Sequence, residues 1–329
     1  MQALARPFHE LDSFDRGFLL LVGRVRLVSP EHHLGMTLKK IKDIRLWGPE
    51  STLLRSVMLR SWAEHGAPLV EAIQAAFIPT DDWYKVDGQQ ISDAFKKYDA
   101  IGEKVWAAVK PSVRDLFQMC QGRAVEHVKR QRRAAKVAKI DFEASEWLAY
   151  LASALEDHLE WAVTEYPEMV LHAAVQRIIQ IVQASSQFRV MDKAALKDRI
   201  AALVTQPGNY LSLVGDLHMG RLWSFTGLQT AMAEGVSTYA VVTQWDAVTC
   251  DVCAVISGKT FSVSRTYEVV QHYLDSNPRQ DGDNMVFPRF EDVDNKSPES
   301  FYDTGLIPPF HPRCRCDIVF VWSEMRLAA

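Results

Sequence analysis

Four of the chain's five cysteines lie in two short clusters, and their spacing is typical of metal ligands. The first cluster is Cys250-Asp-Val-Cys253, and the second is His311-Pro-Arg-Cys314-Arg-Cys316. A spacing of two intervening residues lets one short turn aim two donor atoms at the same ion, and thiolates with imidazole are donors that zinc accepts. We therefore predict that the two clusters form the two halves of one zinc site.

The two clusters offer five donors, whereas a structural zinc ion takes four. We favour a set of four cysteines, in which Cys314 and Cys316 need a bend between them, with His311 as the closest substitute because His311 and Cys314 repeat the spacing of the first cluster. The favoured set is Cys250, Cys253, Cys314 and Cys316. The first cluster alone would also fit a redox-active cysteine pair, but the second cluster favours a metal.

Short strands are predicted on either side of the two clusters. Residues 238–245 are rich in β-branched and aromatic side chains, which predicts a strand that leads into the first cluster. Residues 260–263 could form a short returning strand, and residues 317–322 predict a last strand that begins directly after Cys316. A small α+β domain would therefore position the donors.

The remainder of the chain has mainly helical patterning. Apolar residues recur every three or four positions over 51–206, which predicts a helical region, while residues 1–50 are mixed and suggest an arm or a strand-containing segment. Pro207-Gly208-Asn209 marks a boundary, after which residues 207–329 form the C-terminal domain with a polar insertion at about 264–307. The predicted fold class is α+β, with a mainly helical N-terminal and middle region and a small C-terminal α+β zinc-binding domain.

One segment of the chain is strongly basic, although the formal net charge of the whole chain is −4. The overall charge gives no general attraction to nucleic acid, so binding would need a local patch. The segment could be the solvated face of a long helix or a surface that contacts packaged double-stranded DNA. Its basic residues are Arg123, Lys129, Arg130, Arg132, Arg133, Lys136 and Lys139.

The sequence predicts neither a secretory signal nor a membrane span. The N-terminus has no cationic start followed by a continuous apolar segment. The longest strongly apolar stretch, residues 18–22, is far shorter than the roughly 20 residues that a membrane helix needs. We expect no membrane partner, and in a reducing cytosol the cysteines would stay free to bind metal.

The C-terminal motifs resemble those of a known family. The motifs, in chain order, are Trp245-Asp246, Cys250-x-x-Cys253, Gly258 and Pro308-Pro309-x-His311-Pro312-x-Cys314-Arg315-Cys316. Together they look like the C-terminal signature of the phage Mu F-type minor head proteins of tailed bacteriophages, also called head morphogenesis proteins. The helix before them, with Arg221 and Thr226, is similar to the helix that leads into that signature, so the resemblance covers about residues 214–320.

The resemblance implies a structural protein of the virion. A member of this family is a minor capsid protein of the head interior or portal vertex, is present in the host cytoplasm during assembly, and binds the portal protein and inner capsid proteins. We predict no catalytic residues and no enzymatic activity. The alternatives are a zinc-containing nuclease, which would use His311 and Asp246, or a DNA-binding regulator that uses the basic segment.

Overall fold

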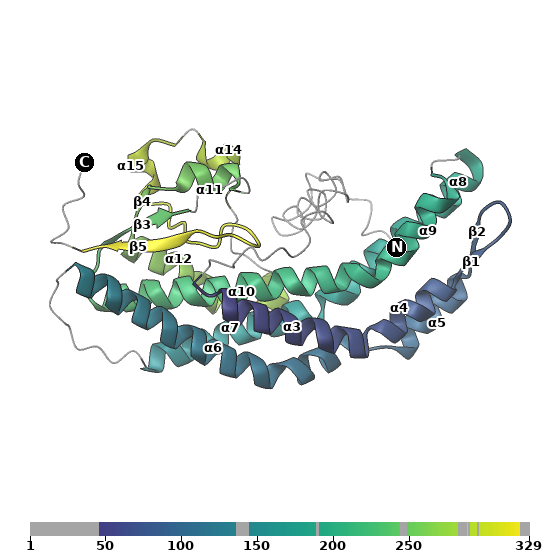
Figure 1. The fold of residues 1–329 in the computed structure, drawn as a ribbon, viewed down its shortest axis with the longest axis horizontal. Coiled ribbons are helices and arrows are strands. Elements are labelled where there is room, and N and C mark those ends of the chain that lie inside the picture. Colours follow the sequence, from purple (N-terminus) through teal and green to yellow (C-terminus); the bar gives the residue numbers. More distant parts are fainter. Residues whose placement is uncertain are drawn as a thin grey trace. The chain divides into compact units, whose positions relative to one another are not determined.

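The structure is a computed structural model of the chain, and most of its described residues are helical (Figure 1). The strands of a three-stranded sheet lie in the C-terminal part of the chain, so the predicted mixture of a mainly helical region and a small sheet-containing C-terminal region is confirmed. The arm or strand predicted within residues 1–50 lies almost wholly outside the described residues. The structure describes residues 46–322 except 136–144, 189–190, 244–248, 282–287, 289 and 295.

The described elements between residues 46 and 233 are helices and one short hairpin. They are α3 (Gly48–His65), α4 (Ala67–Ala75), β1 (Phe77–Pro79), β2 (Tyr84–Val86), α5 (Gly88–Lys97), α6 (Ile101–Ala134), α7 (Ser145–Thr164), α8 (Tyr166–Phe188), α9 (Lys193–Ala201), the 3-10 helix η2 (Ala202–Val204) and α10 (Thr205–Ala233). Among the described residues, none of these helices combines the length and apolar character that crossing a membrane requires.

The last third of the chain combines strands with short helices. Its elements are β3 (Thr238–Val242), α11 (Asp251–Ile256), β4 (Thr260–Ser262), α12 (Val263–Asp275), α13 (Pro278–Asp281), α14 (Phe290–Val293), α15 (Pro298–Phe301) and β5 (Asp317–Val321). All three strands that the sequence predicts here are present, although β3 ends at Val242 and the predicted strand end, residues 244–245, lies in an undescribed gap.

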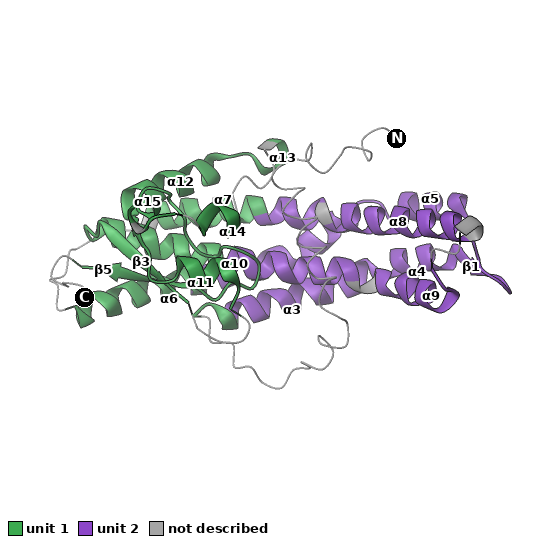
Figure 2. Ribbon diagram, turned by 90° about the horizontal axis from the view of Figure 1, so that it is seen from above, with its two compact units in different colours: residues 1–49, 120–158, 220–329 green, residues 50–119, 159–219 purple. Residues whose placement is uncertain are grey.

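The chain forms two compact units, each gathered from segments that are not consecutive (Figure 2). The long helices α6, α7 and α10 each contribute one part to each unit. Unit 1 comprises Met1–Pro49, Cys120–His158 and Gly220–Ala329, and unit 2 comprises Glu50–Met119 and Leu159–Met219.

Unit 2 is built from helices that bury apolar stripes. On α3 the buried residues Leu54, Met58 and Trp62 recur every four positions, which places them on one helix face. Helices α6 and α7 approach so closely that a Cβ atom built on Gly102 would lie 2.0 Å from the backbone oxygen of Thr164. Glycine is therefore required at this crossing, because every other residue would clash with backbone.

Two prolines lie inside helices that the sequence did not predict in full. Helix α10 begins at Thr205 and continues through Pro207-Gly208-Asn209, the residues at which the sequence indicated a boundary. Proline fits the first turn of a helix, where its missing N–H has no intrahelical partner to lose. Pro111 lies inside the continuous helix α6.

The sheet of unit 1 has the strand order β4-β3-β5, and both pairs are antiparallel. In the register of β3 and β5, Tyr239 is opposite Phe320 and Val241 is opposite Ile318. These four side chains are buried, whereas the alternate residues of both strands are at least partly exposed. One face of the sheet therefore packs into the core of unit 1, which fixes the register of β5 and with it the position of the residues that precede β5.

Candidate metal centre

The first cysteine pair is positioned by the short helix α11. Cys250 is the N-cap residue of this helix, and its Sγ accepts a hydrogen bond from the backbone N–H of Cys253 at 3.4 Å. The cap turns both sulfurs toward one region, because the capping side chain must fold back over the first turn. Cys253 is buried and Cys250 is partly exposed. Asp246, four residues earlier, lies outside the described residues.

The second cluster is positioned by a turn that leads into β5. The N–H of Cys314 donates to the carbonyl oxygen of His311 at 3.0 Å, and Arg313 within this turn has a φ of 63°. A positive φ is unusual for a residue with a side chain, so the turn has a specific, tightly bent backbone. Cys316 then directly precedes the strand, and Cys314 and Cys316 are both buried.

All five predicted donors come together around Cys253. Its Sγ lies 3.1 Å from His311 Nε2 and 3.8 Å from Cys314 Sγ, and His311 Nε2 is 3.2 Å from Cys250 Sγ. The donors form two overlapping triads, each with its ligand atoms within 4.8 Å of one another, and Cys253 belongs to both. The triads are Cys250, Cys253 and His311, and Cys253, Cys314 and Cys316. The cluster can therefore bind a metal ion.

The imidazole of His311 is oriented for coordination through Nε2. Its Nδ1 lies 2.8 Å from the carbonyl oxygen of Pro312. A carbonyl oxygen can only accept, so Nδ1 carries the proton and Nε2 presents its lone pair to the cysteine sulfurs when the ring is neutral. A hydrogen bond of this kind to the distal ring nitrogen is the usual way in which proteins orient a metal-binding histidine.

The electrostatics of the cluster favour a bound cation. Hydrogen bonds with Cys253 and then with His311 lower the pKa of Cys250 to about 4, whereas contacts with Cys250 and the other two sulfurs raise the pKa of Cys253. Burial opposes a charge on His311, but the hydrogen bond with Cys250 and the charge of Cys314 raise its pKa to about 9. Buried thiolates repel one another, so the cysteines of the cluster cannot all be deprotonated at once without a bound cation. A divalent cation removes this limit and releases protons when it binds.

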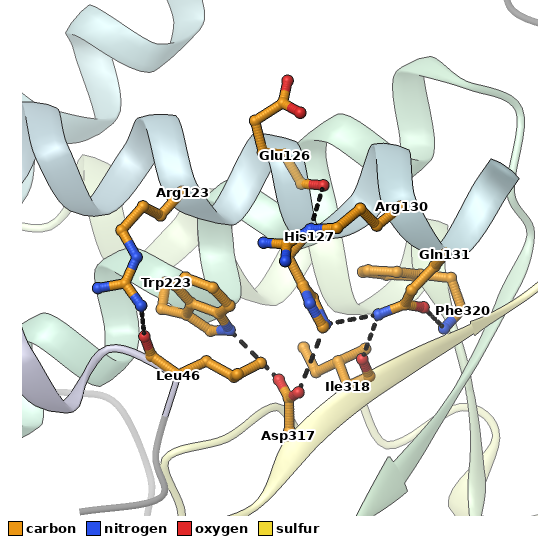
Figure 3. Close-up of polar contacts among 10 residues, drawn as sticks. All are labelled: Leu46, Arg123, Glu126, His127, Arg130, Gln131, Trp223, Asp317, Ile318 and Phe320. Carbon is orange, nitrogen blue, oxygen red and sulfur yellow. Dashed lines mark hydrogen bonds and ion pairs between the residues drawn. The ribbon is translucent and has the colours of Figure 1, made fainter. Parts of the chain in front are cut away.

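A polar network fastens β5 to helices α6 and α10 directly after the cysteines (Figure 3). Asp317 Oδ1 accepts a hydrogen bond from Trp223 Nε1 at 3.2 Å, and Asp317 Oδ2 lies 3.4 Å from His127 Nε2. Trp223 belongs to α10 and His127 to α6. The residue next to Cys316 is thus held by two helices of unit 1, which fixes the end of the second cluster.

Gln131 covers the outer edge of β5 (Figure 3). Its Oε1 accepts from the N–H of Phe320 at 2.8 Å, and its Nε2 donates to the carbonyl oxygen of Ile318 at 3.0 Å. The same Nε2 also lies 2.8 Å from His127 Nε2. The side chain therefore satisfies edge groups that would otherwise be open to another strand.

Sequence reasoning did not find this network. Gln131 and Phe320 are 189 residues apart in the chain, and neither belongs to a recognisable motif. The one available signal was the spacing of His127 and Gln131, which are four residues apart and so lie on one face of a helix.

The basic segment divides between a buried ion pair and an exposed stripe. Arg132 is buried and its Nη1 donates to both carboxylate oxygens of Glu234 at 2.7 Å, so it is not part of an exposed basic surface. The exposed stripe on α6 includes Arg123, Arg130 and Arg133, and Lys129, which pairs with Glu126 at 3.1 Å, is partly exposed beside it. Lys136 and Lys139 lie outside the described residues.

The chain was compared with models of protein families, with curated proteins and with solved structures. None of the three comparisons finds a match.

Proposed function

We propose that this chain is a minor capsid or head morphogenesis protein of a tailed bacteriophage, associated with the portal and the capsid interior, and that its C-terminal part holds a structural zinc ion. The observation that supports it best is the convergence of Cys250-x-x-Cys253 and His311-x-x-Cys314-x-Cys316 around one centre. These are the motifs that carry the resemblance to the Mu F-type signature. The proposed partners are the portal protein and inner capsid proteins.

The donor chemistry favours zinc in a structural role. Thiolates with an imidazole bind soft or borderline cations such as zinc far better than magnesium or calcium, which prefer oxygen ligands. A catalytic zinc ion keeps one coordination position for water, whereas five protein donors here exceed the four positions that zinc offers. Three of the donors, Cys253, Cys314 and Cys316, are also buried. We therefore assign no catalytic role to the centre.

The exposed stripe on α6 supports a second contact, with packaged double-stranded DNA. Arg123, Arg130 and Arg133 are exposed and lie on one helix face. Each phosphate contact contributes about 0.9 to the slope of log affinity against log salt concentration. Replacing Arg130 and Arg133 with glutamine should lower this slope by up to about 2. The matched control is Arg60→Gln with Arg177→Gln, which removes the same charge from two exposed positions of unit 2.

The proposal as a whole is tested on purified phage heads. Mass spectrometry of heads from an infection should detect the chain, and heads formed without it should contain less portal or package less DNA. Isolated protein should bind assembled portal in sedimentation experiments and should not hydrolyse DNA.

Two results together would replace this proposal with the nuclease alternative. One is the absence of the chain from purified heads. The other is hydrolysis of DNA by the isolated protein that is lost in His311→Ala and retained in His272→Ala. His272 lies on α12 and is absent from both donor triads, so it serves as the matched histidine control.

A further inference from the structure

We propose that the ion is held by Cys250, Cys253, His311 and Cys314, and that Cys316 lies outside the coordination sphere. This assignment rests on the metal site of the proposed function and specifies its ligands. It replaces Cys316, which belongs to the set favoured from the sequence, with His311. The assignment follows from the separations of the donor atoms, from the turns that present them and from the charge that the site must bury.

His311 cannot be left out of a site that uses both cysteines of the first pair. Its Nε2 lies 3.2 Å from Cys250 Sγ and 3.1 Å from Cys253 Sγ. Around a tetrahedral zinc ion, with bonds of about 2.3 Å to sulfur and about 2.1 Å to nitrogen, a sulfur and a nitrogen ligand are about 3.6 Å apart. An ion bonded to both sulfurs would therefore lie against Nε2, because the hydrogen bond of Nδ1 to Pro312 already turns this nitrogen toward them.

Cys314 supplies the fourth position. Its Sγ is 3.8 Å from Cys253 Sγ, and two sulfurs around one tetrahedral zinc ion are also about 3.8 Å apart. Cys314 and His311 are presented by one closed turn, as Cys250 and Cys253 are by the first turn of α11. Two short turns thus each contribute two ligands.

Cys316 has a different environment. Its side chain is fully buried, lies in contact with the sulfurs of Cys253 and Cys314, and also hydrogen-bonds with the side chain of Thr243. Its backbone N–H donates to Cys314 Sγ, so Cys316 helps to hold this ligand in place. Four thiolates would give a zinc site a net charge of −2, whereas three thiolates and an imidazole give −1. The smaller charge costs less to bury.

The assignment is tested first on the unaltered full chain loaded with zinc alone. X-ray absorption at the zinc edge should report three sulfur ligands and one nitrogen ligand. Four sulfur ligands would overturn the assignment while leaving the proposed structural zinc site intact. Failure of the chain to bind zinc or cobalt(II) at all would instead refute the metal site, so the two failures are distinguishable.

Matched variants give a second reading with cobalt(II) as the probe. Cys316→Ala and Cys316→Ser should bind one ion per chain by native mass spectrometry and keep the thiolate charge-transfer band of the parent. Cys314→Ser should lose one of three thiolate contributions to that band. His311→Ala should weaken binding by more than the roughly 10–100-fold that loss of an outer-shell partner costs. A weaker band in both Cys316 variants, with unchanged binding in His311→Ala, would overturn the assignment.

Discussion

The helical core of unit 2 and the metal centre of unit 1 depend on different kinds of interaction. In unit 2, buried side chains such as Leu54 and Met58 each contribute to a large apolar core, so the stabilisation is spread over many residues. In the metal centre, a six-residue helix and one turn position five donors, and the ion would join segments about 60 residues apart. Unit 2 should therefore tolerate the loss of a single apolar contact. The metal centre, in contrast, should lose most of its stabilisation when the ion is removed.

Removing the metal is expected to give the largest difference between the two regions. Zinc binding contributes on the order of 10 kcal/mol to folded zinc-finger peptides, so a chelator should strongly destabilise the segments around α11 and β5. Amide hydrogen exchange should rise at residues 250–258 and 311–321 and stay unchanged at the α6 residues 105–113 of unit 2. Added zinc should restore protection and added magnesium should not. Unchanged exchange at 311–321 would show that the ion does not hold this region.

Breaking the buried ion pair between α6 and α10 should have the second-largest effect. Glu234→Gln leaves Arg132 buried without its countercharge, which should cost about 3 kcal/mol in the free energy of unfolding of unit 1. Glu126→Gln, which alters exposed pairs on the same helix, should change it by less than about 0.5 kcal/mol. Urea unfolding measures both, and the double variant Arg132→Leu with Glu234→Leu should recover most of the loss.

Equal stabilities for Glu234→Gln and Glu126→Gln would contradict the importance of the buried pair. That result would leave the metal as the dominant polar contribution to unit 1.

Local patterns in the sequence predicted the parts of the fold that depend on neighbouring residues. The β-branched run before the first cluster predicted β3, and the spacing of Cys250 and Cys253 predicted that they belong to one site. Contacts between distant residues that carry no motif were not predictable in this way. Arg132 was grouped with its basic neighbours, because its partner Glu234 is 102 residues away and carries no signal in the basic segment.

The start of α10 was missed for a different reason. Pro207 and Gly208 are common in loops, but the first turn of a helix tolerates both, since its N–H groups make no intrahelical bonds. Gly208 also lies close to Leu59, because a Cβ built there would be 3.2 Å from Leu59 Cδ2. Pro207 and Gly208, which in the local sequence indicate a break in the helix, are therefore compatible with the first turn of α10 and with the residues packed around it.

A smaller effect is expected where two helices of unit 2 touch through backbone. Gly102→Ala places a methyl group against the carbonyl of Thr164, and the helices must separate, which should cost about 2 kcal/mol of unfolding free energy. Gly122→Ala on the same helix is the matched control, because a Cβ there meets nothing within 4 Å. The control should gain up to about 1 kcal/mol from helix propensity. A gain in both variants would show that the crossing can relax freely.

The smallest effect is expected at the edge of β5, and it tests whether the metal centre relies on the surrounding polar network. Gln131→Ala removes the hydrogen bonds to Phe320 and Ile318 and should cost about 1 kcal/mol. Gln89→Ala, which loses one exposed hydrogen bond to Asp93 in α5, should cost about 0.3 kcal/mol. Exchange of the Phe320 amide should accelerate in Gln131→Ala at unchanged zinc content. Loss of zinc in this variant would instead show that α6 and β5 help to hold the second cluster in place, so that the ion and the network stabilise unit 1 together.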